Sequence, residues 1–303
     1  KRSDILIFDL FGFSALWSPL FMISIFMVGV LFFLVTTVFR QKISIESEKL
    51  TVKQASVFLL VLVLIYALLG SPIDLLGHIM FSVHMTVMAT LYLVVPPLFI
   101  ISIPNWLWRK FLSLRMIRVC FRFLTMPLIA LLVFNGLFSF YHIPLIFDVV
   151  KTNMTLHTIY TVVLFVTAVC MWWPLVNQLE EHQDFSGLKR IGYVFANGIL
   201  LTPACALIIF ANHSIYETYS NPLVWAQAME LCVPASTLAN LNLTGPEMFN
   251  TMPLLDDQKT GGVIMKIIQE IVYGFILAKI FFAWYNKENE GAVDMNPKVQ
   301  QSL

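Results

Sequence analysis

The sequence predicts an all-α polytopic membrane protein: a bundle of seven transmembrane helices with the N-terminus outside and the C-terminus inside. Of its 303 residues, 58% are hydrophobic and only 12% are charged, whereas a soluble domain carries about a quarter charged residues. The mean hydropathy is +0.80. The chain also contains seven apolar segments of about twenty residues, the length that a helix needs to cross the hydrocarbon layer.

The seven predicted spans cover residues 17–39, 54–70, 75–103, 119–140, 154–176, 191–212 and 262–284. The first is too long and too uniformly apolar for the core of a signal peptide, and no small-residue cleavage site follows it, so we interpret it as a retained helix. Prolines and glycines inside several spans predict kinks, which neighbouring helices compensate in membrane bundles. Because no internal repeat or low-complexity linker is present, we expect residues 1–303 to form one domain.

The distribution of Lys and Arg predicts the orientation of the bundle. The connection between the third and fourth spans carries Arg109, Lys110, Arg115 and Arg118 and no acidic residue, which places it in the cytoplasm. The connection 213–261 carries one lysine and five acidic residues, which fits the outside. We therefore expect a multi-pass protein of the cell (plasma) membrane, with the lipid bilayer as its surroundings.

Composition and motifs exclude several classes of function. A net charge of +1 argues against a nucleic-acid partner. We find no arrangement of nucleophile and base, no glycine-rich phosphate loop and no ATP-binding motif, so we expect no enzymatic activity. The four cysteines are widely spaced without a CxxC motif and predict neither a disulfide framework nor a thiolate zinc site. We interpret those in apolar runs as buried thiols.

The predicted orientation brings most histidines to one side of the membrane. Five of the six, His78, His84, His142, His157 and His213, fall on the extracytoplasmic half, and only His182 falls on the inner side. His84 and His157 lie within apolar spans, where an ionisable side chain is costly and commonly functional. Met80, Met85, Met88 and Met154 lie at the same level.

The stretch HIMFSVHMTVM, residues 78–88, concentrates these residue types. On a continuous helix Met80, His84 and Met88 line one stripe. His78 lies about 9 Å from His84 along the axis and about 120° around it, so we do not expect the two to share a metal ion. His78 would instead belong to a position where the ion is first taken up.

Imidazole and thioether together form a soft ligand set, which suits Cu(I) better than zinc, magnesium or calcium. The candidate ligands are His84, Met85, Met88, His157, His142 and His78. Whether Met85 or Met88 is the ligand stays open, as does whether His78, His142 and His213 are ligands or rim residues. Methionine also fills gaps in packed cores, so ordinary packing remains an alternative for the methionines.

Six short motifs resemble those of a known family. They are HM at 84–85, PPL at 96–98, IP at 103–104, YHIP at 141–144 with Asp148, WWPL at 172–175 and DQKTGGVIM at 257–265. Together they resemble the CtaG family of membrane-bound cytochrome c oxidase (caa-type) assembly factors. The resemblance implies a seven-helix fold, a role in supplying copper during oxidase assembly, and oxidase subunits as partners. Many relatives carry a second histidine four residues after that of HM; Met88 stands there in this chain, which favours a methionine-containing site.

The expected function is that of a membrane-embedded Cu(I) chaperone, which binds copper on the extracytoplasmic half and delivers it to the oxidase. Another copper-donating protein would be a further partner, and the oligomeric state stays open. Two alternatives remain. A copper transporter would need polar or Met stripes through the inner half, which is mostly Leu, Val, Phe and Ile. A haem-binding membrane redox protein would use paired histidines such as His84 and His157.

Three further pairs of residues carry expectations. Asp148 and Asp257 are equally well interpreted as partners that orient imidazole ligands and as caps of loops or helices. Lys266 and Glu270, four residues apart, predict an ion pair on one helix. Trp172 and Trp173 are expected to anchor their helix at the membrane interface.

Overall fold

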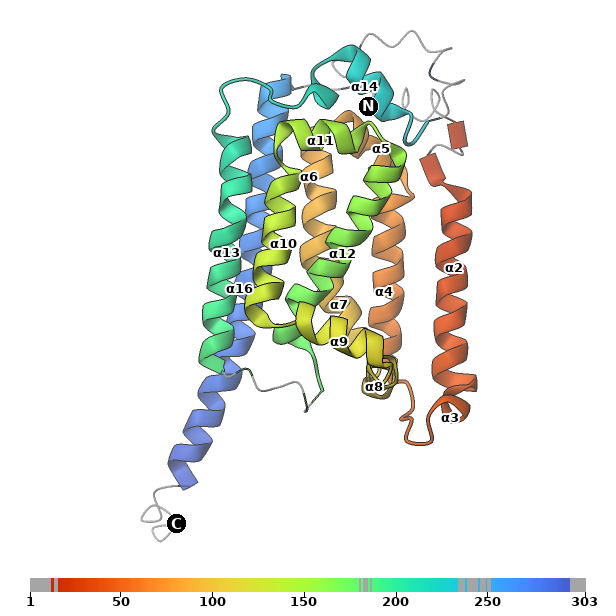
Figure 1. The fold of residues 1–303 in the computed structure, drawn as a ribbon, viewed down its shortest axis with the longest axis vertical. Coiled ribbons are helices and arrows are strands. Elements are labelled where there is room, and N and C mark those ends of the chain that lie inside the picture. Colours follow the sequence, from red (N-terminus) through yellow and green to blue (C-terminus); the bar gives the residue numbers. More distant parts are fainter. Residues whose placement is uncertain are drawn as a thin grey trace.

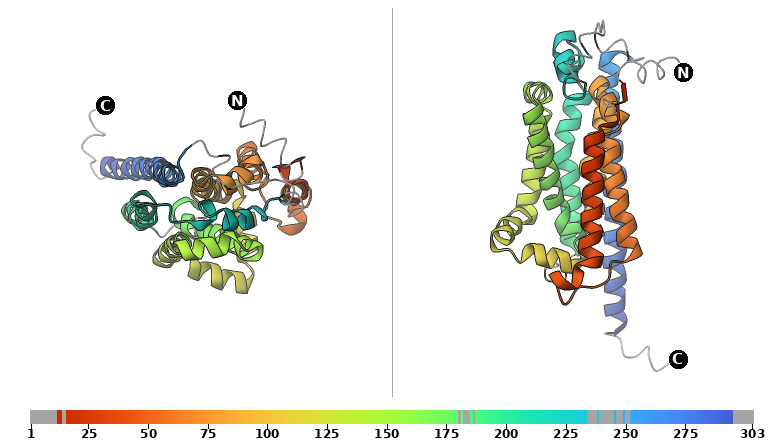
Figure 2. Two further views of the ribbon diagram at one scale, coloured as in Figure 1. Left: turned by 90° about the horizontal axis from the view of Figure 1, so that it is seen from above. Right: turned by 90° about the vertical axis from the view of Figure 1, so that its right-hand side faces the viewer.

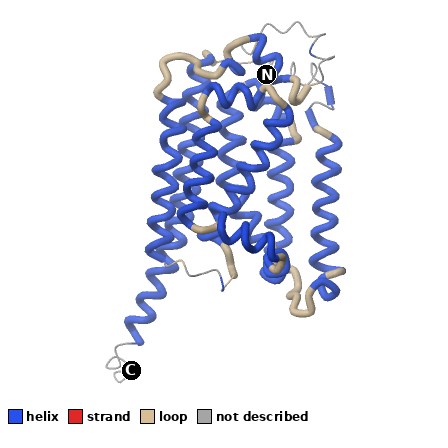
Figure 3. The backbone as a smooth tube through the Cα atoms, viewed as in Figure 1, coloured by secondary structure: helices blue, strands red, loops and turns tan. Residues whose placement is uncertain are grey.

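The computed structural model describes residues 12–13, 16–179, 181, 185, 187–233, 238, 245, 249 and 252–294. Helices account for most of this part of the chain, which contains no β-strand (Figure 3). The all-α class predicted from the sequence is confirmed.

Long helices run along the axis of the molecule, and short helices lie across its two ends (Figure 1). The long elements are α2 (Pro19–Phe33) with a π-helical continuation (Leu34–Val38), α4 (Val52–Leu69), α6 (Phe81–Ala89), a π-helical segment (Thr90–Val94), α7 (Val95–Ser102), α10 (Pro127–Tyr141), α12 (Met154–Val176), α13 (Gly187–Ile209) and α16 (Leu254–Asp294). At one end lie α5 (Pro72–Ile79), α11 (Pro144–Lys151), a 3-10 turn (Glu217–Tyr219) and α14 (Pro222–Met229). At the other end lie α3 (Arg40–Ile43), α8 (Asn105–Leu112) and α9 (Arg115–Leu124).

Five helical segments of the described chain are long and apolar enough to cross a membrane. They are Pro19–Val38, Val52–Leu69, Phe81–Ser102, Met154–Val176 and Gly187–Ile209. The pair α9 and α10, bent by 76° at Thr125 and Met126, makes a sixth if it counts as one span. The seventh predicted span, residues 262–284, lies within the 41-residue helix α16, which is not among these segments. The count of seven and the orientation therefore stay predictions.

The third predicted span, 75–103, is not one continuous helix. Helix α5 ends at Ile79, Met80 is extended (φ −120°, ψ 126°), and α6 begins at Phe81. The carboxylate of Asp257 in α16 accepts hydrogen bonds from the backbone N–H groups of Phe81 (2.7 Å) and Ser82 (3.3 Å) and from the Ser82 hydroxyl. A side chain of a distant helix thus satisfies the free N–H groups at the start of α6, as an N-cap residue otherwise does.

The paired prolines of α7 explain the position of a buried tryptophan. Pro96 has no N–H to donate to the carbonyl of Tyr92, four residues earlier. The Trp172 indole N–H donates to this carbonyl instead, at 3.1 Å. Trp172 is fully buried and Trp173 is 2% exposed. The expectation that they anchor α12 at the membrane interface is therefore wrong, because both pack inside the bundle.

Two adjacent glycines allow α16 to pack tightly between α6 and α13 (Figure 2). A Cβ atom on Gly261 would lie 2.8 Å from Cδ1 of Phe81 in α6, and one on Gly262 would lie 2.8 Å from Cγ1 of Ile209 in α13. Further along α16, Nζ of Lys266 lies 2.8 Å from Oε1 of Glu270, which confirms the predicted helix pair.

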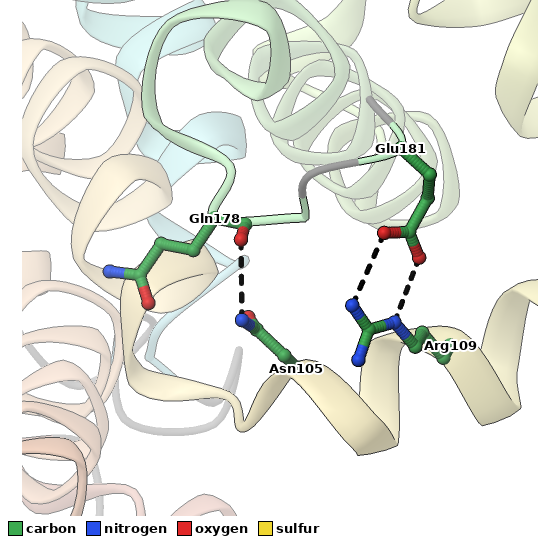
Figure 4. A network of polar contacts seen from close by, with 4 residues as sticks. All are labelled: Asn105, Arg109, Gln178 and Glu181. Carbon is green, nitrogen blue, oxygen red and sulfur yellow. Dashed lines mark hydrogen bonds and ion pairs between the residues drawn. The ribbon is translucent and has the colours of Figure 1, made fainter. Parts of the chain in front are cut away.

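Polar contacts join α8 to the segment that follows α12, at the end of the molecule near α9 (Figure 4). The Asn105 side-chain amide donates to the carbonyl of Gln178 at 3.3 Å. The Arg109 guanidinium donates twice to the Glu181 carboxylate, at 2.8 and 3.2 Å. These contacts fix the basic helix α8 across this end of the bundle.

Candidate metal centre

A small cavity lies among α4, α5, α6, α11 and α12, at the end of the molecule that carries α11 and α14. Its volume is about 20 Å³, enough for one water molecule or one ion. We call it the histidine cavity. Its lining consists of Leu69, Asp74, Gly77, His78, His84, Val87, Met88, Leu91, Tyr92, Lys151, His157 and Thr161.

Three helices each contribute one histidine to this cavity. His78 comes from α5, His84 from α6 and His157 from the first turns of α12. The ring centroids of His78 and His157 lie 5.8 Å apart. Nε2 of His84 lies 3.4 Å from the Tyr141 hydroxyl, and its ring meets Phe147 edge-on at 5.3 Å. The aromatic neighbours hold the His84 ring in place at the cavity wall.

On a continuous helix the side chains of His78 and His84 were expected to point to different places. The structure differs, because both side chains line this cavity. The extended residue Met80 redirects the chain between them. Gly77 then lies against the backbone of His84, its Cβ position 3.5 Å from the Cα of His84.

The structure separates the two candidate methionines. Met88 lines the histidine cavity. Met85 is fully buried but faces α16, where its Cγ lies 3.0 Å from the Cβ position of Gly261. The tertiary structure thus makes Met88 the methionine that can reach an ion in the cavity. Met80 and Met154 are not among the residues that line it, and Met154 is 53% exposed.

His142 and His213 are not among the residues that line the cavity. His142 is fully buried, with its Nδ1 2.7 Å from the carbonyl of Phe138 and its Nε2 without a hydrogen-bond partner among the described residues. Burial lowers the pKa of this imidazole to about 4. His213 is exposed in the connection after α13. His182 lies outside the described residues.

Two charged residues at the cavity were not singled out in the sequence. Lys151, at the end of α11, is 1% exposed, and its Nζ lies 3.2 Å from Nδ1 of His78. Asp74 lies one turn before His78 on α5. Burial raises the pKa of the Asp74 carboxyl to about 6, against the effect of Lys151, and lowers the pKa of Lys151 to about 8. Neither residue belongs to a recognisable motif. The sequence signals that could have suggested them are the position of Asp74 one helical turn before His78 and the position of Lys151 shortly before α12.

Asp74 and His78 also approach a cysteine from a distant part of the chain. Ligand atoms of Asp74, His78 and Cys232 all lie within 4.8 Å of one another. In the part of the chain that the structure describes, this is the only group of three His, Cys, Asp or Glu side chains with such spacing. The four thiols differ in burial: Cys170 and Cys205 are buried, Cys232 is partly exposed and Cys120 is exposed.

The two aspartates expected either to orient imidazoles or to cap backbone groups act as caps. Asp257 caps α6, as described above. The Asp148 carboxylate accepts hydrogen bonds from the backbone N–H groups of Glu217 (3.1 Å) and Thr218 (3.0 Å) and from the Thr218 hydroxyl (2.8 Å). Both therefore fix the elements around the cavity without contacting its histidines.

Comparison with known protein families places the chain in one of them. Residues 30–287 match the family model described as cytochrome c oxidase caa3 assembly factor (Caa3_CtaG). The match covers most of the chain, so the protein belongs to the family of caa3 cytochrome c oxidase assembly factors. No curated protein and no solved structure matches the chain.

Proposed function

We propose that the protein binds Cu(I) in the histidine cavity and delivers it to subunits of a caa3-type cytochrome c oxidase during assembly. Copper is the cargo of this function. The proposed ligands are His84 and His157 from two facing helices, with His78 and Met88 completing the set as the ion requires. Another copper-donating protein would load the cavity, and the bilayer of the plasma membrane would surround the bundle.

The observation that carries this proposal is the convergence of three imidazoles and one thioether on a cavity of about 20 Å³. Imidazole and thioether ligands favour Cu(I) over hard cations. Ionisable side chains are costly inside an apolar bundle, and the three histidines, Asp74 and Lys151 at one cavity support a role in binding. The family membership supplies the process in which such a site would act.

The shape of the cavity argues against both alternatives considered for this chain. A porphyrin needs far more space than a cavity of about 20 Å³ provides, so a haem cannot lie between His84 and His157 without rearrangement. Towards the centre of the bundle the cavity ends at Leu91 and Tyr92, and Phe134, Phe138 and Trp172 fill the core near them. The inner half thus offers no polar path for ion transport among these residues.

The test is a Cu(I) competition titration of the purified protein against a Cu(I)-specific chromogenic chelator. For the unchanged protein we expect stoichiometric Cu(I) binding and Zn(II) binding that is weaker by at least about 100-fold. For the double variant His84→Ala, His157→Ala we expect the Cu(I) affinity to fall by more than about 100-fold, which corresponds to about 2.7 kcal/mol. His213→Ala is the matched control, because it removes an exposed imidazole outside the cavity.

Cu(I) binding by the double variant at the wild-type affinity would show that the cavity is ordinary packing. Equal or tighter retention of Zn(II) would exclude the copper assignment. A full loss of oxidase activity in cells that carry the double variant, with normal levels of the assembly factor, would connect binding to assembly.

A further inference from the structure

His78 lies between two groups of potential metal ligands. On one side are the cavity residues His84, His157 and Met88. On the other side is Cys232, whose ligand atom lies within 4.8 Å of those of His78 and Asp74. Asp74 belongs to both groups, because it also lines the cavity. Because Asp74 and His78 share one face of α5 and Cys232 follows α14, the second group is built by the packing of two short helices.

Cys232 and Asp74 in the second group are partly exposed, while His78 is 3% and His84 6% exposed. His157 in the first group is also partly exposed. The Cys232 thiol donates a hydrogen bond to the Asp74 carboxylate, with Sγ 3.4 Å from Oδ2. A cation that arrives from this end of the molecule would therefore meet Cys232 before it meets His84.

The chemistry of this group suits a soft cation. A thiolate with an imidazole binds both Cu(I) and Zn(II), and the carboxylate can add a weaker third ligand. The thiol proton would be released to the buffer as sulfur binds the metal. Nδ1 of His78 lies 3.2 Å from Lys151 Nζ, which leaves Nε2 as the ring nitrogen that can bind the metal.

We propose that Cys232, Asp74 and His78 form an outer binding position for Cu(I), and that the ion then moves into the histidine cavity by exchanging Cys232 and Asp74 for His84 and His157 while His78 stays bound. The existence of the outer position stands by itself; the transfer step rests on the proposed function. Ligand exchange around a shared imidazole avoids a fully dissociated ion in an apolar bundle, where an unpaired charge is costly.

The first experiment traps the ion at the outer position by using the His84→Ala, His157→Ala double variant. The purified variant is incubated with a maleimide in two samples, one with Cu(I) and one without metal. The incubation time is chosen so that Cys232 is fully modified in the sample without metal. The modified cysteines are then identified by mass spectrometry. We expect Cu(I) to protect Cys232 at least tenfold. The exposed Cys120 on α9 is the internal control and should react equally in both samples.

Adding Asp74→Asn should weaken this protection, and adding His78→Ala should abolish it, whereas His213→Ala should leave it intact. Equal modification of Cys232 with and without Cu(I) would overturn the proposal. So would protection that survives His78→Ala, since the thiol would then bind alone, or protection by Zn(II) and not by Cu(I).

The second experiment uses the otherwise unchanged protein and does not depend on the stability of the double variant. Cys232→Ser should slow Cu(I) uptake from a chelator at least tenfold without changing the final stoichiometry, because only the outer position is lost. An unchanged rate would overturn the transfer step. If Cu(I) protects Cys232 but never binds in the cavity, the outer position stands and the proposed function fails.

Discussion

Met85 and Met88 lie three residues apart on α6 and have different neighbours. Met88 is 5% exposed and lines the cavity, whereas Met85 is completely buried against Gly261 of α16. Both are apolar, flexible side chains, and only their surroundings distinguish a potential ligand from a packing residue. The difference gives a direct test of ligation at the scale of one residue.

Met88→Leu should weaken Cu(I) binding about tenfold, or about 1.4 kcal/mol, because leucine keeps the volume and loses the sulfur. Met85→Leu is the matched control and should change the affinity by less than about twofold. The measurement is the chelator competition titration. A loss confined to Met85→Leu would contradict the assignment of Met88 to the cavity.

At the scale of elements, the site depends on the break between α5 and α6. The Asp257 carboxylate holds the first N–H groups of α6, and the Tyr219 hydroxyl donates to the carbonyl of Gly77 in the last turns of α5 at 2.5 Å. Two distant segments thus fix both sides of Met80. The break allows His78 and His84 to face the same cavity.

Asp257→Ala should lower the stability of the protein by about 1–2 kcal/mol, the usual cost of losing a cap, and should also weaken Cu(I) binding. Asp256→Ala is the matched control, because Asp256 is the exposed neighbour in the same first turn of α16. Thermal unfolding in detergent and the Cu(I) titration measure the two effects. Equal effects of the two variants would show that the cap is not needed.

The close packing of α16 makes a second prediction at this scale. Gly261→Ala places a methyl group 2.8 Å from Phe81 Cδ1 and 3.1 Å from the Cα of Ser82. We expect overpacking to lower the stability by about 1–3 kcal/mol. Gly274→Ala, also on α16, meets no atom within 4 Å and should leave thermal unfolding unchanged or raise its midpoint, because alanine favours helix. A tolerated Gly261→Ala would contradict the tight contact between α16 and α6.

At the scale of the whole molecule, the two ends differ in chemistry. The histidine cavity lies at the end that carries α11 and α14, and the basic helices α8 and α9 lie at the opposite end (Figure 1). The excess of Arg and Lys predicts that the α8–α9 end faces the cytoplasm. The cavity would then face the extracytoplasmic side.

Single-cysteine labelling tests this orientation. In a background with Cys120→Ser and Cys232→Ser, which keeps only the buried Cys170 and Cys205, His213→Cys should react with a membrane-impermeant maleimide in intact cells, because His213 lies beyond α13 at the cavity end. Leu114→Cys, at the 57% exposed residue between α8 and α9, should react only after the cells are lysed. Reversed labelling would place the cavity on the cytoplasmic side.

The sequence alone determined the helical class, the concentration of histidines and methionines in a few segments, and the family. These properties follow from composition, from the length of apolar runs and from local motifs, none of which needs contacts between distant residues. Local reasoning included His84, His157 and Met88 among the candidate ligands, and the structure places all three at the cavity. It also predicted the Lys266–Glu270 pair, which is confirmed. The same local reasoning failed where distant contacts decide: it placed Trp172 at the membrane interface and separated His78 from His84.

Only the tertiary structure decided which residues meet at the cavity. Asp257 lies 176 residues from Phe81, and Cys232 lies 158 residues from Asp74. The first contact caps the start of α6, and the second brings a thiol close to His78. Neither is encoded by spacing or periodicity, because the packing of α16 and α14 against α5 and α6 creates both. For the same reason, Lys151 and Asp74 were recognised as part of the site only after the helices were assembled.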